Sequence, residues 1–367
     1  MNKKIMIIGM GGTISALKNS NKELDYTPGK IDSRELLELA GIDNACYSEV
    51  DIIYFQLCNL NSDDISLIHM LSLVSLIREN AENNGVTGVL ILHGTDTMEE
   101  TAFLLSVAAL PNIPVIITGS MLPADDDNYD GIKNIKDSLT VLVDMILKGS
   151  ESAINSGFLS ENPSFLIDKT PMLESKISVK ETHNVFVVFG GELFPAIGIK
   201  KMACFGTQPF ITDDIKYIAS LHNTSDSLAD FLGLHNVVFP ISLFSDEPHF
   251  KSSEELKTSS CEAAHSALPL VPIIYFSTDA DPSVFDYYLS IGAKGFVIAG
   301  AGAGEYSIPF INKTAELFDK HIPVIRTSKT KNGPVSQNGT MMKYTIDGGN
   351  VPPEKAAILL KLILMSY

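Results

Sequence analysis

The fold is decided by the stretch Val89-Leu90-Ile91-Leu92-His93-Gly94-Thr95-Asp96-Thr97-Met98-Glu99-Glu100-Thr101. Its first four residues are apolar and predict a buried strand, and a mostly apolar segment of helical character follows from Met98 to Leu110. The turn between them places Thr95 and Asp96 at the carboxyl end of a strand and at the start of a helix. Open α/β folds bind ligands at such positions, so this turn is a candidate site.

The same turn also has a purely structural interpretation. Thr97 and Glu100 have the spacing of a capping box, and Asp96 suits the first turn of a helix. A second stretch favours function, because the apolar residues 5–8 run into a glycine turn that carries a threonine, at residues 9–14. Two such turns, each following a strand of one sheet, can face a common site.

Composition limits the possible classes of protein. The chain has 367 residues, 45% of them hydrophobic and 19% charged, which is typical of a globular protein long enough for two domains. Its net charge of −17 argues against nucleic acid or an anionic membrane surface as a partner. The four cysteines (Cys46, Cys58, Cys204 and Cys261) are widely spaced, which predicts free thiols and no metal site. No apolar run reaches membrane-spanning length and the N-terminal run is too short for a signal peptide, so we expect a cytoplasmic protein.

Strands and helices are expected to alternate along the chain. The expected strands of the first part are residues 5–8, 50–57, 86–92, 115–117 and 185–189, and the expected helices are residues 34–40, 62–80, 98–110 and 134–147. This order predicts an α/β fold with a mostly parallel sheet and helices on both faces. We expect a larger N-terminal domain over residues 1–212, a linker over 213–231 and a smaller α/β C-terminal domain over 232–367.

At these motifs the sequence resembles the bacterial-type L-asparaginases, the asparaginase/glutaminase family. The two signatures of that family are a Gly-Gly-Thr-Ile turn and a His-Gly-Thr-Asp-Thr-Met-Glu-Glu-Thr-Ala block, matched here by residues 11–14 and 93–102. A third match covers residues 117–123, although the family usually has arginine where Leu122 stands. The resemblance implies an amidohydrolase that releases ammonia from an asparagine-type side-chain amide, without a metal or an organic cofactor. Residues 150–183 are an insertion relative to the family.

Amide hydrolysis needs an activated nucleophile and a proton acceptor, because a threonine hydroxyl is a weak nucleophile at neutral pH. Thr13 and Thr95 are both candidates. The dipole of the helix N-terminus favours an ionised Asp96, which could hold Lys201, and neutral Lys201 could take a proton from Thr95 or from water. The resemblance implies that Thr13 is acylated, that Tyr26 assists it, and that Thr95, Asp96 and Lys201 form a second group. Lys200 replaces Lys201 if the alignment is shifted by one residue.

The resemblance also implies substrate contacts from Gly12, Gly94 and Ser120. In the family, a hydroxyl residue after the second main strand holds the substrate's α-carboxylate. Our alignment places that hydroxyl at Leu57, next to Cys58, and leucine cannot form this hydrogen bond. Ser62 or Asn61 could take its place.

In the C-terminal domain, Asp279 stands where the family offers an asparagine to the site of a neighbouring subunit. This position implies a homodimer or a homotetramer. Together with the leucine and the insertion, the added negative charge indicates a substrate that differs from free L-asparagine. A modified asparagine, a peptide-linked amide or a specialised-metabolite amide would fit.

Three other classes compete with this interpretation. The first is the asparaginase-like subunit of a tRNA-dependent amidotransferase, for which the negative charge is unfavourable. The second is a non-catalytic amino-acid sensor, against which the joint presence of all five candidate catalytic residues argues. The third is a nucleotide-binding protein that uses the glycine loop at residues 300–304, which lacks a well-placed acidic partner for a ribose.

Overall fold

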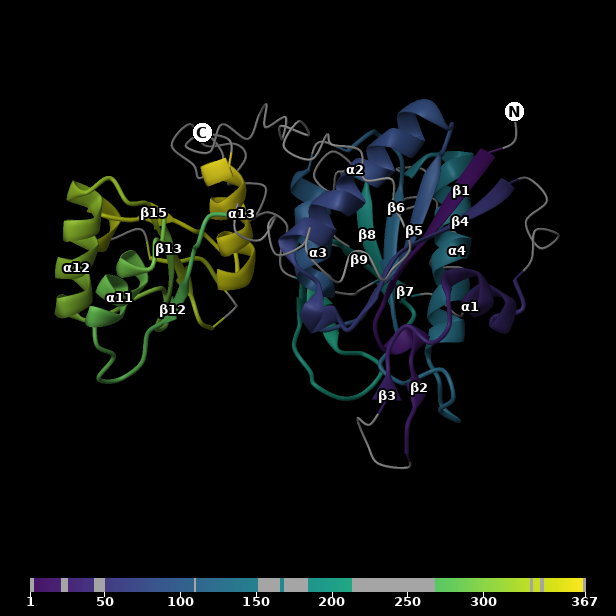
Figure 1. Ribbon diagram of the computed structural model, residues 1–367, viewed down its shortest axis with the longest axis horizontal. Helices are drawn as coiled ribbons and strands as arrows, with labels where there is room; N and C mark the ends of the chain where they lie inside the picture. Colours follow the sequence, from purple (N-terminus) through teal and green to yellow (C-terminus); the bar gives the residue numbers. More distant parts are fainter. Residues whose placement is uncertain are drawn as a thin grey trace. The chain divides into compact units, whose positions relative to one another are not determined.

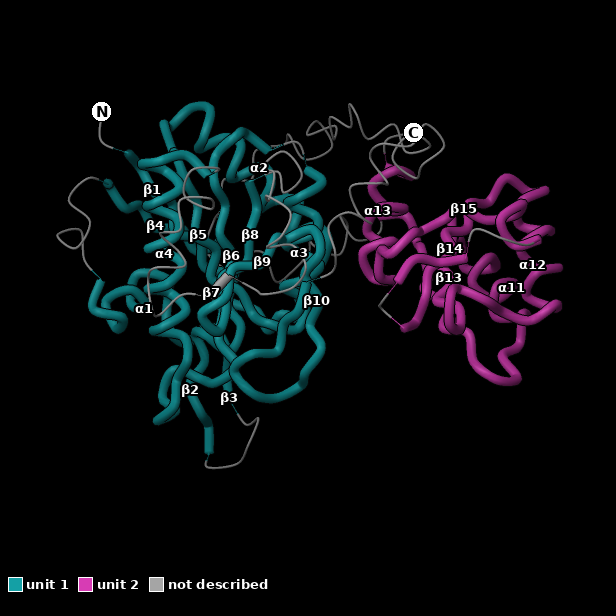
Figure 2. The backbone as a smooth tube through the Cα atoms, turned by 180° about the vertical axis from the view of Figure 1, so that it is seen from behind, with its two compact units in different colours: residues 1–214, 250–255 teal, residues 215–249, 256–367 magenta. Residues whose placement is uncertain are grey.

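The structure is a computed structural model that describes residues 3–20, 26–42, 50–108, 110–150, 166–167, 184–212, 268–330, 333–336 and 340–365. Contacts between Cα atoms divide the chain into two compact units (Figure 2). The first unit contains the described residues up to 212, and the second contains those from 268 onward. The expected linker over residues 213–231 lies outside the described residues, as does nearly all of the insertion over residues 150–183.

The first unit is built on a sheet of seven strands in the order β4-β1-β5-β6-β8-β9-β7 (Figure 1). In chain order these strands are β1 (Lys3–Gly11), β4 (Val50–Leu60), β5 (Gly88–Leu92), β6 (Val115–Thr118), β7 (Leu166–Ile167), β8 (Val185–Phe189) and β9 (Glu192–Pro195). Every pair of neighbours is parallel except β8 and β9, which are antiparallel. The sheet is therefore mostly parallel, as the alternation of elements predicts.

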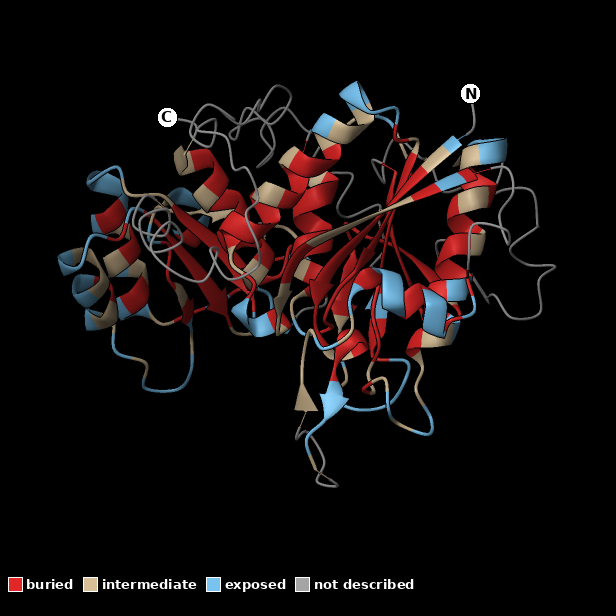
Figure 3. Ribbon diagram, turned by 45° about the vertical axis from the view of Figure 1, so that its right-hand side comes forward, coloured by how far each residue is buried: buried red, intermediate tan, exposed pale blue. Residues whose placement is uncertain are grey.

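Helices cover both faces of this sheet. On one face lie α1 (Ser33–Leu39) and α4 (Gly131–Lys148), and on the other lie α2 (Leu67–Asn83) and α3 (Met98–Val107) (Figure 1). Alternation along β1 sends Ile5 and Ile7 into the core beneath α1 and α4, together with Leu139 and Leu142 of α4. The strands β5, β6 and β8 are buried along their whole length (Figure 3), which explains their uninterrupted apolar sequences.

The parallel register brings the turns after three strands to one edge of the sheet. Gly9 of β1 pairs with Leu92 of β5, and Leu92 pairs in turn with Thr118 of β6. The glycine turn that follows β1, the turn at His93 and the loop after β6 therefore begin side by side.

Small elements complete the first unit around this edge. They are the 3-10 turns η1 (Thr13–Ser15) and η2 (Ser62–Asp64), the short hairpin of β2 (Leu17–Lys18) and β3 (Tyr26–Thr27), and the hairpin of β10 (Ile199–Lys201) and β11 (Phe210–Thr212). The helix expected from Ser62 thus begins only at Leu67, because residues 62–64 form a separate turn. The N-cap of α1 is Asp32, which forms a full capping box with Glu35.

The second unit has a parallel sheet in the order β12-β13-β14-β15. Its elements are β12 (Ile273–Tyr275), α11 (Ser283–Ser290), β13 (Phe296–Gly300), α12 (Ile308–Asp319), β14 (Val324–Ser328), η7 (Thr340–Lys343), β15 (Ile346–Asp347) and α13 (Pro353–Met365). Phe285, Phe296 and Phe310 pack edge to face in its core. None of the helices in the described part of the chain combines the length and apolar character that a membrane span requires.

Candidate active site

The site is built where two glycine turns touch. Gly11 and Gly12, at the end of β1, have φ values of 92° and 84°, which glycine adopts readily and other residues do not. A Cβ atom on Gly12 would lie 2.2 Å from the Cα of Gly94 in the turn after β5. The two backbones therefore approach more closely than side chains allow, and Thr13 and Thr95, the residues that follow these glycines, lie on adjacent turns.

Thr13 begins the 3-10 turn η1 and keeps part of its surface exposed. Its Oγ1 donates a hydrogen bond of 3.2 Å to the hydroxyl oxygen of Tyr26, which comes from the short strand β3. The structure therefore brings together the first pair of candidate residues, on two segments that are separated in the sequence by the β2–β3 hairpin.

Lys201, at the end of β10, joins the second group. Its Nζ donates to Thr95 Oγ1 at 2.9 Å and to Asp96 Oδ1 at 2.5 Å. The side chains of Lys201 and Asp96 are 14% and 65% exposed, so the lysine is largely sheltered while the carboxylate faces solvent. Lys200 is fully buried, and alternation along β10 directs it away from Lys201. Lys201 is thus the lysine that meets Thr95 and Asp96.

A buried carboxylate fixes the backbone of the same lysine. Glu99, in the first turn of α3, accepts a hydrogen bond of 2.9 Å from the backbone N–H of Lys201. The helix that follows the Thr95 turn therefore also anchors the strand that supplies the lysine. This role was not predicted from the sequence, although Glu99 lies within the block at residues 93–102.

Ser62 connects its own 3-10 turn to the Thr95 turn. Its buried Oγ accepts a hydrogen bond of 3.1 Å from the backbone N–H of Asp96, and its carbonyl accepts one of 2.6 Å from Thr97 Oγ1. A Cβ atom on Gly94 would lie 2.8 Å from the Cβ of Ser62. The predicted capping box of Thr97 and Glu100 is therefore wrong, because Thr97 makes no capping hydrogen bond with its side chain and binds the Ser62 carbonyl instead.

His93 is completely buried behind the turn. Its Nδ1 lies 2.6 Å from the carbonyl oxygen of Gly94, and its Nε2 lies 2.9 Å from Thr101 Oγ1. A carbonyl oxygen only accepts, so Nδ1 carries the proton and Nε2 accepts from Thr101. Because a trans peptide points its C=O and N–H in opposite directions, this contact turns the N–H of Thr95 away from the imidazole. Burial lowers the pKa of His93 to about 4, which keeps the ring neutral.

His93 should make stability depend on pH. Its pKa is about 4 in the folded protein, against about 6.5 in an unfolded chain, so the unfolded state takes up the proton first as the pH falls. The stabilisation is complete above about pH 6.5 and declines towards pH 4, with about 2 kcal/mol lost between about pH 7.5 and about pH 5. Urea unfolding of the wild-type protein and of His93→Gln at both pH values measures this. The variant should lack that part of the pH dependence, and identical pH profiles would contradict the assignment.

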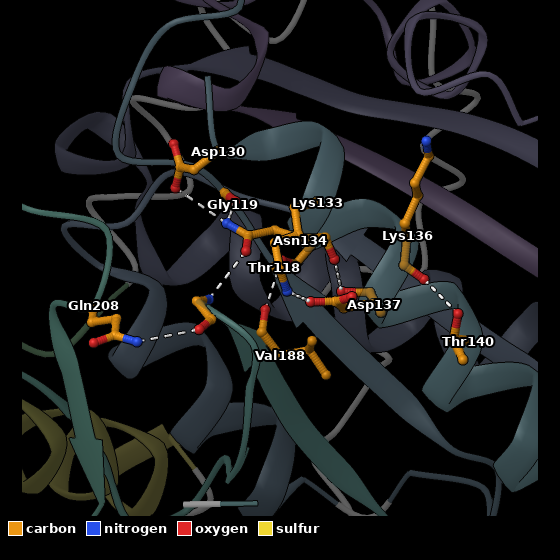
Figure 4. A network of polar contacts seen from close by, with 12 residues as sticks. Thr118, Gly119, Asp130, Lys133, Asn134, Lys136, Asp137, Thr140, Val188 and Gln208 are labelled. Carbon is orange, nitrogen blue, oxygen red and sulfur yellow. Dashed lines mark hydrogen bonds and ion pairs between the residues drawn. The ribbon is translucent and has the colours of Figure 1, made fainter. Parts of the chain in front are cut away.

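The loop after β6 is fixed by hydrogen bonds within the loop and from α4. Ser120 is buried, and its Oγ donates to the carbonyl oxygen of Leu122 at 2.7 Å. Asn134 of α4 donates to the carbonyl of Gly119 at 3.0 Å and accepts at 3.1 Å from the N–H of Gly190, after β8 (Figure 4). This network ties two strand ends together. Because Ser120 donates its proton to the Leu122 carbonyl, only the oxygen lone pairs of that hydroxyl remain for a ligand.

Comparison with known proteins adds independent information. Residues 4–156 match the family model described as the N-terminal part of asparaginase, and residues 270–367 match the model of the glutaminase/asparaginase C-terminal domain. Together they cover more than half of the chain. This chain belongs to the asparaginase family. The resemblance identified in the sequence and the predicted fold class are thereby confirmed.

Several members of the asparaginase family align along almost the whole chain. L-asparaginase 2-3 of Saccharomyces cerevisiae is 24% identical over 374 residues, which cover 99% of this chain and 86% of the relative. Glutaminase-asparaginase of Acinetobacter glutaminasificans is 25% identical, with 98% and 94% covered. The crystal structure of a probable cytoplasmic L-asparaginase from Campylobacter jejuni has the same fold, with a TM-score of 0.66 at 24% identity, and covers 99% of this chain and 95% of that one.

Leu57 and Cys58 occupy places that do not suit a substrate contact. Leu57 is only 2% exposed within β4, and the thiol of Cys58 donates to the carbonyl of Met10 at 3.2 Å. Burial raises the pKa of Cys58 to about 12, so the thiol stays protonated. The hydroxyl that lies at the Thr95 turn belongs to Ser62, while the assignment of the carboxylate contact to the position of Leu57 and Cys58 stays a prediction. Between Gln56 and Leu60, β4 has more residues than the part of β1 that faces it.

Asp279 lies in the second unit, where it is exposed and has a φ of 59°. Its role as a substrate contact stays a prediction. Within the described residues, no group of three or more histidine, cysteine, aspartate or glutamate side chains could hold a metal ion.

Proposed function

We propose that this protein is an amidohydrolase that releases ammonia from an asparagine-type side-chain amide through a threonine acyl-enzyme. One observation carries the proposal: the Lys201 amine binds both Thr95 Oγ1 and Asp96 Oδ1 beside the turn that bears Thr13. Family membership supports it, since relatives in that family are named L-asparaginase and glutaminase-asparaginase.

In the first half-reaction, the Thr13 Oγ1 forms a bond to the amide carbon. Thr13 is the better candidate nucleophile because it is partly exposed, whereas Thr95 is buried and already accepts from Lys201. The Tyr26 oxygen accepts the Thr13 hydrogen bond and so lies on the path of the departing proton. When the C–N bond breaks, the nitrogen takes up that proton and leaves as ammonia, and the acyl group remains on Thr13 as an ester.

In the second half-reaction, water replaces the threonine. Neutral Lys201 accepts a proton from the water, directly or through the Thr95 hydroxyl, as the water oxygen bonds to the ester carbon. The C–O bond to Thr13 then breaks, the proton held by Lys201 passes to the Thr13 oxygen, and the carboxylic acid leaves. Asp96 balances the charge of Lys201 once it is protonated, across the 2.5 Å contact. Backbone N–H groups at the two glycine turns would stabilise the oxyanion in both steps.

Ser62 is our candidate for the hydroxyl that holds the substrate's carboxylate. Its Oγ accepts from the Asp96 N–H, so its own proton is free to be donated to an anionic group of the ligand. Because Ser62 would supply the hydroxyl that Leu57 lacks, free L-asparagine belongs among the candidate substrates, beside L-glutamine and asparagine derivatives.

Ser62→Ala is expected to raise KM for the preferred amide by about tenfold or more, since a charge-assisted hydrogen bond is lost. Leu57→Met, which conserves volume in the strand, should leave KM within about twofold. Steady-state ammonia assays of both variants decide between the two positions. A larger effect at Leu57 than at Ser62 would restore the original alignment.

We also propose that the protein forms a homodimer or a homotetramer and that Asp279 of one subunit completes the site of another. The support is the resemblance, which places a residue for a neighbouring subunit at this position. If Thr13→Ala and Asp279→Ala are each inactive, refolding an equal mixture should recover about a quarter of the wild-type activity, because mixed dimers contain one intact site. No recovery, with mixed dimers detected by mass spectrometry, would place Asp279 outside the shared site.

The cytoplasm is the compartment we propose. The description of the Campylobacter jejuni relative as a probable cytoplasmic L-asparaginase supports it. Fractionation of cells that produce the native chain tests the proposal, and recovery from another compartment would overturn it.

The deciding experiment measures ammonia release from L-asparagine, L-glutamine and a panel of asparagine derivatives, with Thr13→Ala as the control. Release that depends on Thr13 supports the acyl-enzyme, and mass spectrometry of a quenched reaction should find the acyl group on the peptide that contains Thr13. Release that persists in Thr13→Ala would overturn the role of that residue.

A further inference from the structure

The loop that precedes α4 forms hydrogen bonds with the segment that carries Thr13. Residues 123–129 belong to the connection between β6 and α4, and we call them the clasp. The backbone N–H of Ala124 donates to the carbonyl of Ala16 at 2.9 Å, and the hydroxyl of Tyr129 donates to the carbonyl of Ile14 at 2.7 Å. Both carbonyls lie within three residues of Thr13, so the clasp fixes the turn that holds the proposed nucleophile.

The same loop also grips the strand that leads to Tyr26. Both carboxylate oxygens of Asp125 accept from the backbone N–H of Lys18, at 3.1 Å each, and Asp126 Oδ2 accepts from Lys18 Nζ at 2.6 Å. Lys18 is in turn the ladder partner of Tyr26 in the β2–β3 hairpin. A continuous path of contacts therefore runs from the clasp through Lys18 and Tyr26 to Thr13.

The β2–β3 hairpin is too short to hold Tyr26 in place by itself. Each of its strands has two residues, Leu17 and Lys18 are exposed, and Tyr26 and Thr27 are only partly buried. A two-stranded hairpin of this length is at best marginally stable in water. The chain that follows the second strand, β3, is held by Ser15, which accepts hydrogen bonds from the backbone N–H groups of Gly29 and Lys30. The first strand, β2, is held by the clasp through the hydrogen bonds of Asp125 and Asp126 to Lys18.

The clasp is itself anchored. The ring of Tyr129 packs against the hydrophobic core under α4, and the other oxygen of the Asp126 carboxylate accepts from the N–H of Asn128 at 2.9 Å. The hydrogen bond with Lys18 lowers the pKa of Asp126 and raises that of Lys18, so both groups are charged at neutral pH. The clasp therefore presents fixed anionic acceptors to Lys18.

We propose that the clasp is a positioning element for the Thr13–Tyr26 pair, in which Tyr129 fixes the Thr13 turn while Asp125 and Asp126 hold Tyr26 in reach of Thr13 through Lys18. This inference rests on the proposed function for its kinetic consequences only. Asp125, Asp126 and Lys18 touch no reacting atom and act through the tyrosine.

A double-mutant cycle tests the path to Tyr26. Asp125→Ala removes both acceptors of the Lys18 N–H and should lower kcat/KM about fivefold, while Asp125→Asn keeps one oxygen acceptor and should recover most of that loss. In a Tyr26→Phe background, Asp125→Ala should cause no further loss, because the group it positions is gone. Asp127→Ala is the matched control, since it removes an exposed neighbouring carboxylate and should change kcat/KM less than twofold. An equal loss in both backgrounds would overturn the proposal.

A second measurement needs no activity. Hydrogen exchange of the Lys18 backbone amide should accelerate about tenfold in Asp125→Ala and stay unchanged in Asp127→Ala, because only the first loses its acceptor. Unchanged exchange in Asp125→Ala would overturn the clasp whatever the kinetics show. If the wild-type protein releases no ammonia while exchange responds as expected, the proposed function fails and the clasp stands as an element that orders the hairpin.

Discussion

Replacing Lys201 with methionine is expected to lower kcat by about 10²–10⁴-fold, the range that a general acid or base typically contributes. Methionine keeps the length of the side chain but has no amine to bind Thr95 and Asp96, which Lys201 contacts at 2.9 and 2.5 Å. The backbone hydrogen bond to Glu99 should survive, since it uses the Lys201 N–H. Single-turnover kinetics should show a larger defect in hydrolysis of the acyl-enzyme than in its formation.

Lys200→Met is the matched control for this prediction. The two lysines are neighbours in β10, but Lys200 is fully buried and belongs to the opposite face of the strand. Its replacement should change stability more than the chemical step, with kcat per folded molecule within about tenfold of wild type. If Lys200→Met abolished turnover and Lys201→Met preserved it, the assignment of the lysine would be reversed.

Gly12→Ala is expected to have the second large effect. The added Cβ would lie 2.2 Å from the Cα of Gly94, a backbone atom that cannot move aside cheaply, and the φ of 84° is itself strained for alanine. We expect more than about 4 kcal/mol of destabilisation, or a folded protein without activity, because separating the turns moves Thr13 away from Thr95. Urea unfolding combined with the ammonia assay distinguishes these two results.

Gly41→Ala isolates the contribution of backbone strain. Gly41 has a φ of 69°, and nothing lies within 4 Å of the Cβ that alanine would add. The Gly41→Ala substitution should therefore lower the free energy of unfolding by about 1–2 kcal/mol, which is the backbone penalty alone, and leave activity per folded molecule unchanged. Equal destabilisation by the two substitutions would show that the contact between the glycine turns has no energetic role.

The parts of this protein that the sequence predicts well are those set by local patterns. The apolar run before His93 forms β5, and the helix expected from Met98 begins at that residue as α3. The order of strands and helices was enough to bring the turns of Thr13 and Thr95 to one sheet edge, since parallel strands end on the same side. The pairing of Thr95 and Asp96 with Lys201 was predicted from the resemblance alone, because Lys201 lies on β10, outside the parallel sheet.

The parts that the sequence does not predict depend on contacts between distant segments. The spacing of Thr97 and Glu100 fits a local cap, but the Thr97 hydroxyl binds the carbonyl of Ser62, which lies more than thirty residues earlier. The hydrogen bond from the Asp96 N–H to Ser62 Oγ likewise joins segments that are far apart in the sequence. Glu99 was overlooked because its partner is a backbone N–H on another strand, which no sequence pattern displays.

The contact between Gly12 and Gly94 has a consequence for how the enzyme could change. In the proposed mechanism Thr13 carries the acyl group and Thr95 can relay the proton of the attacking water, and their turns meet where the backbones of Gly12 and Gly94 face each other without side chains. A displacement of either turn is passed to the other, so acylation and deacylation cannot be tuned independently by moving the main chain. Variants with altered selectivity should therefore arise from substitutions of side chains around this contact, while Gly12 and Gly94 themselves should tolerate little change.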